Sequence, residues 1–324
     1  APVDHAQARA MLDDIAAAEL LRGVRGEHPV DAEALADMLC RVSELVTDFP
    51  EIREFDLNPV FADAQGAVAA DVRVLLGSES DPPVTHSQDE IIDVMTRLMR
   101  PESVAVIGAS AEEGKIGHSV LRNLVNGGYA GDIYPINPKA DEILGYRAYP
   151  SITDVPGAVD VAVFAVPAKL VPPALEQCGA KGVPAAVLIP SGFAETGNQE
   201  LQDQVVAVAR KHGIRLLGPN IYGYYYTPSS LCATFCTPYD VRGKVALTSQ
   251  SGGIGMAILG FSRTTRMGVS AIVGLGNKSD VDEDDLLTFF EQDDNTQCVA
   301  MHLEDLKDGR SFVRAARRTT KKKP

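Results

Sequence analysis

The chain has 324 residues, enough for two or three domains, with 45% hydrophobic and 23% charged residues. Its formal net charge is −14, which argues against nucleic acid as the main partner because binding a phosphate backbone needs a basic surface. The sequence contains no apolar run of membrane-spanning length and no signal peptide, and its five scattered cysteines suit a reducing compartment, so we expect a cytoplasmic protein that contacts no membrane.

The first 77 residues predict two amphipathic helices and a β-hairpin. Residues 6–22 carry apolar side chains at helical spacing, and a second such run follows Asp31, a candidate N-cap. Strand-like runs at 51–61 and 67–76 flank a turn at 64–66. Residues 77–88 are polar and contain two consecutive prolines, which predicts a linker before a helix over 88–99.

From residue 103 onward, strands alternate with helices, which predicts a doubly wound parallel sheet. The expected strands cover 103–108, 132–137, 159–166, 185–191 and 214–220, and the expected helices cover 117–128, 172–182 and 200–213. A second α/β cycle begins near residue 243, with strands expected at 244–249, 269–276 and 298–304 and helices at 254–268, 283–294 and 308–323.

The first motif with chemical meaning is a glycine-containing loop between a strand and a helix. The strand ends at Gly108 and the helix starts near Gly117, where a helix N-terminus favours phosphate. The spacing is not G-x-G-x-x-G, and the next strand ends in Asn137-Pro138-Lys139 instead of the acidic residue that would hold an NAD ribose. A lysine suits a phosphate group, so the pattern disfavours NAD. The alternative is a loop that only makes a turn.

Three further loops follow hydrophobic strands, at 163–168, 189–195 and 217–223. Because the carboxyl ends of parallel strands lie at one edge of a sheet, these loops should converge with the first one. Pro167, Pro190 and Pro219 stiffen the three strand ends. A ligand site at this edge is therefore favoured, although any single loop could be an ordinary turn.

A second strand-to-helix turn, TSQSGGIG, occupies residues 248–255. Ser249, Ser251 and the amides of Gly252 and Gly253 could hold a phosphoryl group at the helix start, or the motif could be a tight packed turn. Glu304 ends a later strand and should face the same edge. A carboxylate repels phosphate unless a histidine or metal stands between them, so this placement suits a carboxylate that orients a histidine.

Asn58 and Asp71 lie on the two neighbouring strands of the expected hairpin. Their oxygens could meet on one face and hold Mg²⁺, because hard cations prefer oxygen ligands. Asp and Asn are also common near turns, so an ordinary turn role is the alternative.

Together these motifs resemble the NDP-forming (ADP-forming) acyl-CoA synthetases, relatives of succinyl-CoA synthetase. The motifs that carry the resemblance are SVAVIGAS with GKIG, YPINPKADEILGYRAYPSI, FAVPA, PSGFAE, GPNIYG, LTSQSGGIG, GLGNKSDVDEDDLL, the LE of MHLED, and, nearer the start, LLRGVRG, EFDLNPVFAD and GAVAADVRV.

The resemblance implies an α/β chain in four parts. Residues 1–77 would be the C-terminal portion of an ATP-grasp domain, 78–95 a linker, 96–228 a Rossmann-like CoA-binding domain with a parallel sheet, and 240–324 a partial, flavodoxin-like ligase domain. The implied cofactors are coenzyme A, ATP/ADP and Mg²⁺, and the implied partners are CoA, a small carboxylic acid, and either a second copy of the chain or the remaining ligase domains.

The resemblance also implies an activity, in which ATP and a carboxylic acid form an acyl phosphate, CoA displaces the phosphate, and a histidine carries the phosphoryl group between sites. Ser249, Ser251, Gly252, Gly253 and Glu304 would serve the phosphoryl group, and Asn58 and Asp71 would ligate Mg²⁺. The residues that would contact CoA are Gly108, Ser110, Lys115, Gly117, Asn137, Pro138, Lys139, Val166, Pro167, Pro190, Ser191, Gly192, Phe193 and Asn220.

None of the six histidines matches the family's phosphorylated position, which is expected beyond Pro324. The first part of the ATP-grasp domain is also absent. Two alternatives follow: a CoA-binding regulatory module, or part of a CoA-regulated protein acetyltransferase without ligase activity.

Overall fold

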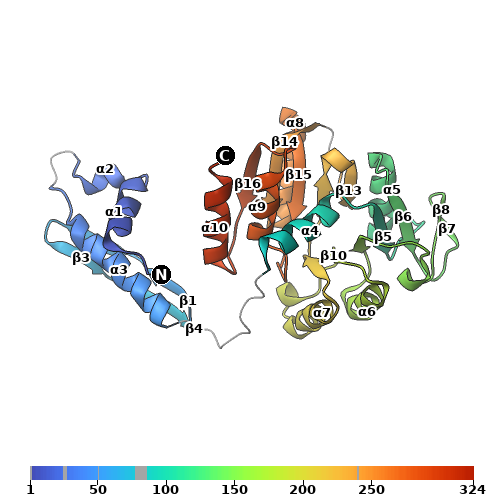
Figure 1. Cartoon of the computed structure of the whole chain (residues 1–324), viewed down its shortest axis with the longest axis horizontal. Coiled ribbons are helices and arrows are strands. Elements are labelled where there is room, and N and C mark those ends of the chain that lie inside the picture. The colour runs from blue at the N-terminus through green and yellow to red at the C-terminus, as the bar shows by residue number, and fades with distance from the viewer. Residues whose placement is uncertain (1, 25–27, 50, 77–85, 239–240) are drawn as a thin grey trace. The chain divides into compact units, whose positions relative to one another are not determined.

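A computed structural model describes residues 2–24, 28–49, 51–76, 86–238 and 241–324 (Figure 1). The chain divides into two compact units, Ala1–Val84 and Thr85–Pro324. Residues 78–85 of the linker expected over 78–95 lie outside the described residues. Within the second unit, the helix expected over 88–99 is confirmed as α4, Gln88–Met99, which begins with a capping box between Ser87 and Glu90.

The first unit begins with helices α1 (His5–Asp14), α2 (Ala18–Leu21) and α3 (Ala32–Asp48). Asp31 is the N-cap of α3 as expected, and its Oδ1 accepts a hydrogen bond of 3.0 Å from the backbone N of Ala34. The single helix expected over 6–22 is wrong, because the backbone of Ile15 is extended and ends α1. The alanine-rich run that follows contains no glycine or proline that would mark this break.

The expected hairpin is present but has four short strands instead of two. β1 (Ile52–Leu57) pairs with β4 (Val72–Leu76), and β2 (Val60–Asp63) pairs with β3 (Gly66–Ala69), both antiparallel. Pro59 falls between β1 and β2, where its missing N–H prevents a continuous ladder. The prediction that the two runs pair with each other is therefore confirmed. The prediction that each run forms one continuous strand is wrong.

The second unit contains the expected five-stranded parallel sheet, in the order β11-β10-β9-β5-β6. Its strands are β5 (Ser103–Ile107), β6 (Asp132–Ile136), β9 (Val161–Phe164), β10 (Ala185–Leu188) and β11 (Arg215–Leu217). Helices α6 (Val171–Lys181) and α7 (Gln199–His212) bury their apolar residues against one face, and α4 and α5 (Ile116–Gly127) bury theirs against the other. The small hairpin β7 (Glu142–Ile143) and β8 (Tyr146–Arg147) follows β6.

The second sheet of this unit has the order β13-β12-β15-β14-β16. Its three parallel strands are those expected: β14 (Arg242–Ser249), β15 (Val269–Gly274) and β16 (Cys298–His302). Two strands were not predicted, β12 (Gly223–Tyr226) and β13 (Leu231–Thr234), which are antiparallel. The tyrosine run Tyr224–Tyr226 was a usable strand signal, because aromatic residues favour strands.

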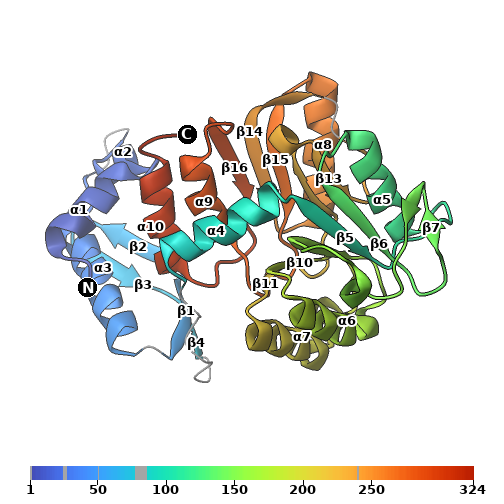
Figure 2. The ribbon, with the colours of Figure 1, turned by 45° about the vertical axis from the view of Figure 1, so that its right-hand side comes forward.

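Helices cover both faces of this second sheet. Leu259 of α8 (Gly252–Thr265) packs on one face, and α9 (Glu283–Gln292) packs on the other. α10 (Gly309–Thr319) lies beside α9, and α4 also runs along α9 (Figure 2). One apolar cluster joins α4, α5, both sheets and α9, so the two α/β layers of this unit share a core.

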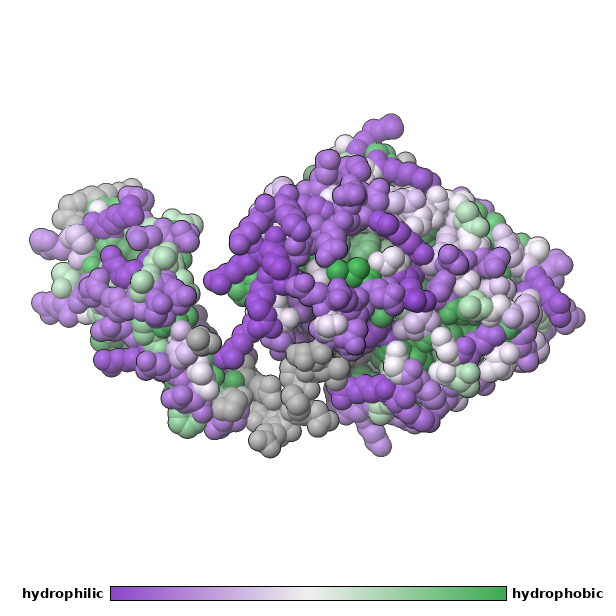
Figure 3. All heavy atoms as spheres, viewed as in Figure 1, coloured by the Kyte–Doolittle hydropathy of each residue, from purple (hydrophilic) through white to green (hydrophobic). Residues whose placement is uncertain are grey.

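The surface shown in Figure 3 is largely hydrophilic on both units. Among the described helices, none is both long enough and apolar enough to cross a lipid bilayer. All five cysteines are free thiols.

Candidate functional site

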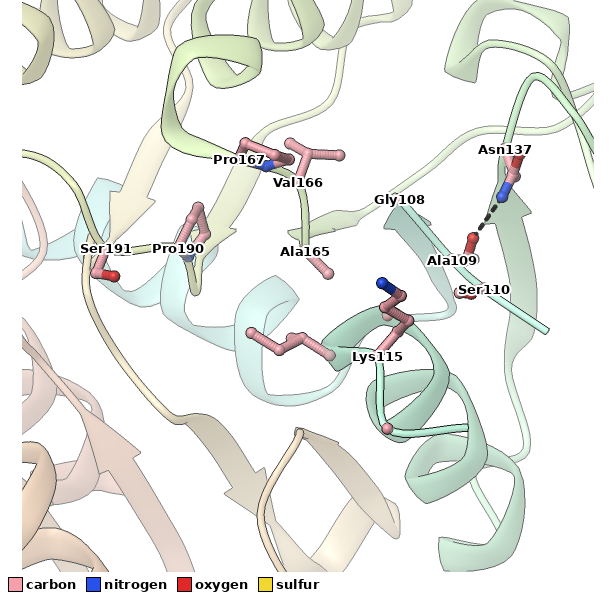
Figure 4. Close-up of a pocket in the computed structure, with 13 residues that line it drawn as sticks. Gly108, Ala109, Ser110, Lys115, Asn137, Ala165, Val166, Pro167, Pro190 and Ser191 are labelled. Carbon is pink, nitrogen blue, oxygen red and sulfur yellow. Dashed lines mark hydrogen bonds between the residues drawn. The ribbon is translucent and has the colours of Figure 1, made fainter. Parts of the chain in front are cut away.

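A cavity of about 520 Å³ opens at the carboxyl ends of β5, β6, β9 and β10 (Figure 4). This is the sheet edge at which the sequence placed a ligand site. The residues that line it are Gly108, Ala109, Ser110, Gly114, Lys115, Ile116, Gly117, Asn137, Ala165, Val166, Pro167, Pro190 and Ser191.

Two glycines shape the floor of this cavity. Gly108 has φ +85°, and a Cβ at this position would stand 2.6 Å from Cγ1 of Val166. A Cβ on Gly117 would stand 2.0 Å from the carbonyl oxygen of Gly108. Only glycine at both positions lets the start of α5 approach the end of β5 this closely.

The N-terminus of α5 meets the cavity without a side-chain cap. Its N-cap residue, Lys115, makes no capping hydrogen bond, so the first amides of a twelve-residue helix face the cavity with their partial positive charge. Figure 4 shows the Lys115 side chain directed toward the space between the ends of β5 and β9. Its Nζ lies 3.8 Å from Oε2 of Glu112. This combination of uncapped amides and an ammonium group suits a phosphate ligand.

The wall formed by β6 is neutral. Nδ2 of Asn137 donates to the carbonyl oxygen of Ala109 at 2.8 Å, and its Oδ1 accepts from the backbone N of Lys139 at 2.8 Å. These two bonds fix the orientation of the Asn137 amide. Among the described residues that line the cavity there is no Asp or Glu, so the acidic ribose clamp of NAD-binding sites is missing here.

The structure brings most of the predicted CoA residues together, but not all of them. Pro138 and Lys139 are exposed just outside the lining, and Gly192 lies beyond Ser191. Phe193 is fully buried in the core under α6 and α7. Asn220 contacts Asn277 across the turn that follows β15. The lining residues that the sequence reasoning missed, Ala109, Gly114, Ile116 and Ala165, are neighbours of predicted ones and could have been found by extending each loop.

His118 has a structural role next to the cavity. It is buried, and its Nδ1 lies 3.1 Å from the carbonyl oxygen of Ser110, so the ring holds the loop that carries Ser110.

The TSQSGG turn forms a second strand-to-helix junction, between β14 and α8. Ser251 is the N-cap of α8, and its Oγ accepts from the backbone N of Ile254 at 3.4 Å. Oγ of Ser249 donates to the carbonyl oxygen of Ser251 at 2.8 Å and lies 3.5 Å from Nδ1 of His302. Gly252 and Gly253 are exposed, so the first amides of this helix are accessible to an anion.

Glu304 lies beside this junction, two residues after the end of β16. Its backbone N donates to Oε1 of Gln250 at 2.9 Å, which places its main chain within one hydrogen bond of the TSQSGG turn. The Glu304 side chain is exposed, and its carboxylate makes no hydrogen bond or ion pair within the described ranges. The structure therefore brings Ser249, Ser251, Gly252, Gly253 and Glu304 into one neighbourhood. Gln250, which joins them, was not singled out by the sequence reasoning.

Asn58 and Asp71 lie opposite each other in the hairpin of the first unit. The backbone N of Asn58 donates to the carbonyl oxygen of Asp71 at 3.2 Å, and both side chains are exposed. Oδ1 of Asp71 also accepts from the backbone N of Val72 at 2.9 Å. Over the described ranges, no group of three or more His, Cys, Asp or Glu residues could hold a metal ion. Two oxygen ligands completed by water remain compatible with Mg²⁺, which keeps several waters.

The sequence matches three known protein families in succession. Residues 1–76 match an ATP-grasp domain, 102–227 a CoA binding domain, and 242–324 a succinyl-CoA ligase like flavodoxin domain.

Individual relatives match the same parts. Acetate–CoA ligase [ADP-forming] II of Archaeoglobus fulgidus is 39% identical over 321 residues, which is 97% of this chain and 46% of that protein. In Pyrococcus furiosus, acetate–CoA ligase [ADP-forming] I is similar through both of its subunits. Its subunit alpha is 48% identical over 233 residues, which is 70% of this chain and 50% of the subunit, and its subunit beta is 46% identical over 76 residues, which is 24% of this chain and 33% of the subunit.

Among solved structures, the fold is similar to that of the Ca. Korarchaeum cryptofilum dinucleotide forming acetyl-coenzyme A synthetase 1 in complex with phosphate and ADP. The TM-score is 0.70 and the identity 46%, over 71% of this chain and 50% of that one. The chain thus spans about half the length of the Archaeoglobus fulgidus enzyme and of the Pyrococcus furiosus subunit alpha, and a third of the subunit beta.

Proposed function

Because the chain belongs to the NDP-forming acyl-CoA synthetases, we propose that it supplies the CoA site and part of the phosphoryl site of an ADP-forming acid–CoA ligase. The reaction converts a carboxylic acid, ATP and CoA into an acyl-CoA, ADP and phosphate. The observation that carries the proposal is the cavity at the α5 N-terminus, where uncapped amides and Lys115 meet the converging ends of four parallel strands.

CoA binds in this cavity through its phosphates. The partial charge of the α5 N-terminus and the Lys115 ammonium attract them, and Gly108 and Gly117 allow the close approach. The neutral Asn137 amide accommodates CoA without repelling it, and the apolar wall of Val166, Pro167 and Pro190 contacts its less polar parts.

The TSQSGG turn serves the phosphoryl group. The exposed amides of Gly252 and Gly253, aided by Ser249 and Ser251, stabilise the negative charge of a phosphoryl group at the start of α8. The Glu304 carboxylate accepts a hydrogen bond from the histidine that carries this group, and so holds the imidazole in the correct orientation. A further segment of the ligase supplies that histidine.

The first unit contributes to the nucleotide side of the reaction. Asn58 and Asp71 provide an amide and a carboxylate oxygen for Mg²⁺. When bound, Mg²⁺ neutralises the charge of nucleotide phosphates. The ligase is cytoplasmic and works together with the remaining ligase domains or as an oligomer, in keeping with its free cysteines and with the separate alpha and beta subunits of the Pyrococcus furiosus enzyme.

Ligand binding to this chain tests the first half of the proposal. Isothermal titration with CoA and with NADH should show binding of CoA and none of NADH. Preference for NADH would overturn the CoA assignment.

Turnover by the full-length protein tests the second half. A panel of carboxylic acids is incubated with the protein, ATP and CoA, and ADP release is followed. At least one acid should give ADP release that requires CoA, and that acid identifies the acyl substrate. CoA binding without acid-dependent ADP release would instead favour a CoA-binding regulatory module.

A further inference from the structure

Gln250 is buried and lies in the sequence between Ser249 and Ser251, the two serines of the proposed phosphoryl site. Its side-chain amide makes all four of the hydrogen bonds that an amide group can make. Its Oε1 accepts from the backbone N of Glu304 at 2.9 Å and of Asp305 at 3.0 Å. Its Nε2 donates to Oε1 of Glu283 at 2.6 Å and to the carbonyl oxygen of Asp305 at 2.7 Å. Three of these four bonds hold the main chain of Glu304 and Asp305.

Lys278 approaches the same segment from the turn after β15. Its side chain is 1% exposed, and its Nζ lies 3.1 Å from Oε2 of Glu283, 2.8 Å from the carbonyl oxygen of Asp305 and 3.0 Å from Oδ1 of Asp305. Glu283 is also buried, with a side chain 2% exposed. Lys307 donates in turn to the carbonyl oxygen of Lys278. Two buried groups, the Gln250 amide and the Lys278 ammonium, thus converge on one short loop.

Stability alone does not account for this arrangement. A buried ion pair such as Lys278–Glu283 gains little net stability, because the cost of removing both charges from water offsets their attraction. Lys278 also has φ +46°, a left-handed conformation that costs free energy in a residue other than glycine. Apolar side chains could fill the same volume, but they could not fix the main chain of Glu304 and Asp305.

The turn that carries Lys278 is itself anchored to the CoA-binding layer. Nδ2 of Asn277 donates to Oε2 of Glu195 at 2.6 Å, and Oε1 of Glu195 accepts from the backbone N of Gly192 at 2.5 Å. Burial alone would raise the pKa of Glu195, but the hydrogen bonds from Asn277 and Gly192 lower it, so Glu195 stays ionised as an acceptor. The loop of Glu304 is therefore braced against the same layer that holds the CoA cavity.

We propose that Gln250 and Lys278 are positioning residues, which hold the main chain of Glu304 and Asp305 beside the TSQSGG turn. This inference rests on the proposed function for its catalytic meaning, since Glu304 is the residue that would orient the phosphorylated histidine. Without Gln250, the main chain of Glu304 and Asp305 loses three hydrogen bonds, and the Glu304 carboxylate no longer has a fixed position relative to the TSQSGG turn.

Hydrogen exchange tests the structural part on the chain as it stands. Gln250→Met removes the acceptor of two amides, so the amides of Glu304 and Asp305 should exchange roughly tenfold faster or more. Ser270→Ala is the matched control: it removes a buried hydrogen bond of 2.8 Å to Thr296 in the same sheet, away from the loop. Equal exchange at residues 304–305 in Gln250→Met and Ser270→Ala would overturn the positioning role.

Steady-state kinetics on the full-length protein test the catalytic part. Gln250→Met should lower kcat roughly 100-fold through misplacement of Glu304, while KM for CoA changes less than about twofold. Gln250→Glu keeps the acceptor for both amides but places a carboxylate oxygen against Glu283 in place of the donor, so it should recover only part of the loss. A kcat for Gln250→Met equal to that of Ser270→Ala, or a loss confined to KM, would refute the role of Gln250.

The exchange result also separates this inference from the proposed function. If the wild-type protein shows no ligase activity, the proposed function fails, and the exchange rates still decide whether Gln250 holds the loop. Should Gln250→Met not fold, Lys278→Arg provides the same two measurements. In Lys278→Arg, the amides of residues 304–305 should exchange faster. The bulkier guanidinium cannot keep all three contacts that the ammonium makes with Glu283 and Asp305. Unchanged exchange and kcat in Lys278→Arg would count against the proposal.

Discussion

Gly117 faces the carbonyl oxygen of Gly108 so closely that a Cβ on Gly117 would stand 2.0 Å from it. The contact joins the first turn of α5 to the end of β5 across the floor of the cavity. The atom nearest to the new Cβ would be a backbone oxygen, which cannot rotate away as the end of a side chain could. No change of rotamer can therefore make room for a methyl group. The distance between a helix start and a strand end, and with it the position of the phosphate-binding amides, depends on these two glycines.

Gly117→Ala should therefore abolish measurable CoA binding and lower the melting temperature, because α5 must move away from β5. Gly260→Ala is the matched control, as it also places a methyl group on a helical glycine but has no atom within 4 Å of the new Cβ. The control should leave CoA affinity unchanged and raise stability by about 0.5–1 kcal/mol. Titration calorimetry and thermal unfolding measure both effects, and wild-type CoA affinity in Gly117→Ala would contradict the role of the contact.

Lys115→Glu should weaken CoA binding more than Lys139→Glu. Both side chains are exposed, but Lys115 lines the cavity, whereas Lys139 lies outside the lining. A charge close to a phosphate interacts strongly, and a more distant one is screened by salt. Calorimetry at low and at physiological salt should show a loss for Lys139→Glu that fades with added salt. An unchanged affinity in Lys139→Glu at low salt would remove Lys139 from the site.

Glu304→Gln should lower kcat of the full-length ligase roughly 100-fold without changing the affinity of this chain for CoA. The amide keeps the size of the carboxylate but loses the charge that orients an imidazole. Steady-state ADP release gives kcat, and calorimetry gives the CoA affinity. A parallel loss of CoA binding would mean that Glu304 acts through the fold or the CoA site instead of the phosphoryl site.

Asp293→Asn should destabilise the chain by about 1–3 kcal/mol at neutral pH. The Asp293 side chain is fully buried and accepts hydrogen bonds from Arg100, Tyr226 and Thr296 at 2.8 Å each. This network ties the end of α4 to the end of α9. Thermal unfolding followed by circular dichroism measures the loss, and an unchanged melting temperature would show that the network is dispensable.

The Asp293 carboxylate should also make the stability of the fold depend on pH, in a direction that its pKa shift defines. Burial alone would raise the pKa of Asp293, but hydrogen bonds from Thr296, Tyr226 and Asn295 lower it below the ordinary 3.8. Since the folded state holds the proton more weakly than the unfolded state, the stabilisation is present above about pH 4 and disappears as pH falls through the folded pKa. The difference in melting temperature between wild type and Asp293→Asn should shrink below about pH 4, and a constant difference would contradict this assignment.

The parallel sheet and its ligand edge could be predicted from the sequence because both depend on short-range patterns. Buried strands read as continuous apolar runs, and Gly108 with Gly117 marks a strand-to-helix turn, so the position of the cavity followed from chain order alone. The break after Asp14 and the strands β12 and β13 escaped prediction. A helix end without glycine or proline leaves no local mark, and the partners of β12 and β13 in the sheet lie far away in sequence or across a turn.

By itself, the sequence determined which loops carry glycine, proline, lysine and serine at strand ends, because covalent order and local propensity set these features. Only the tertiary structure decided that Phe193 is buried, that Lys139 lies outside the cavity, and that Gln250 and Lys278 converge on the backbone of Glu304 and Asp305. Those outcomes depend on contacts between residues far apart in the chain. Such contacts are set by how the layers pack against one another, and packing leaves no periodic signal along the chain.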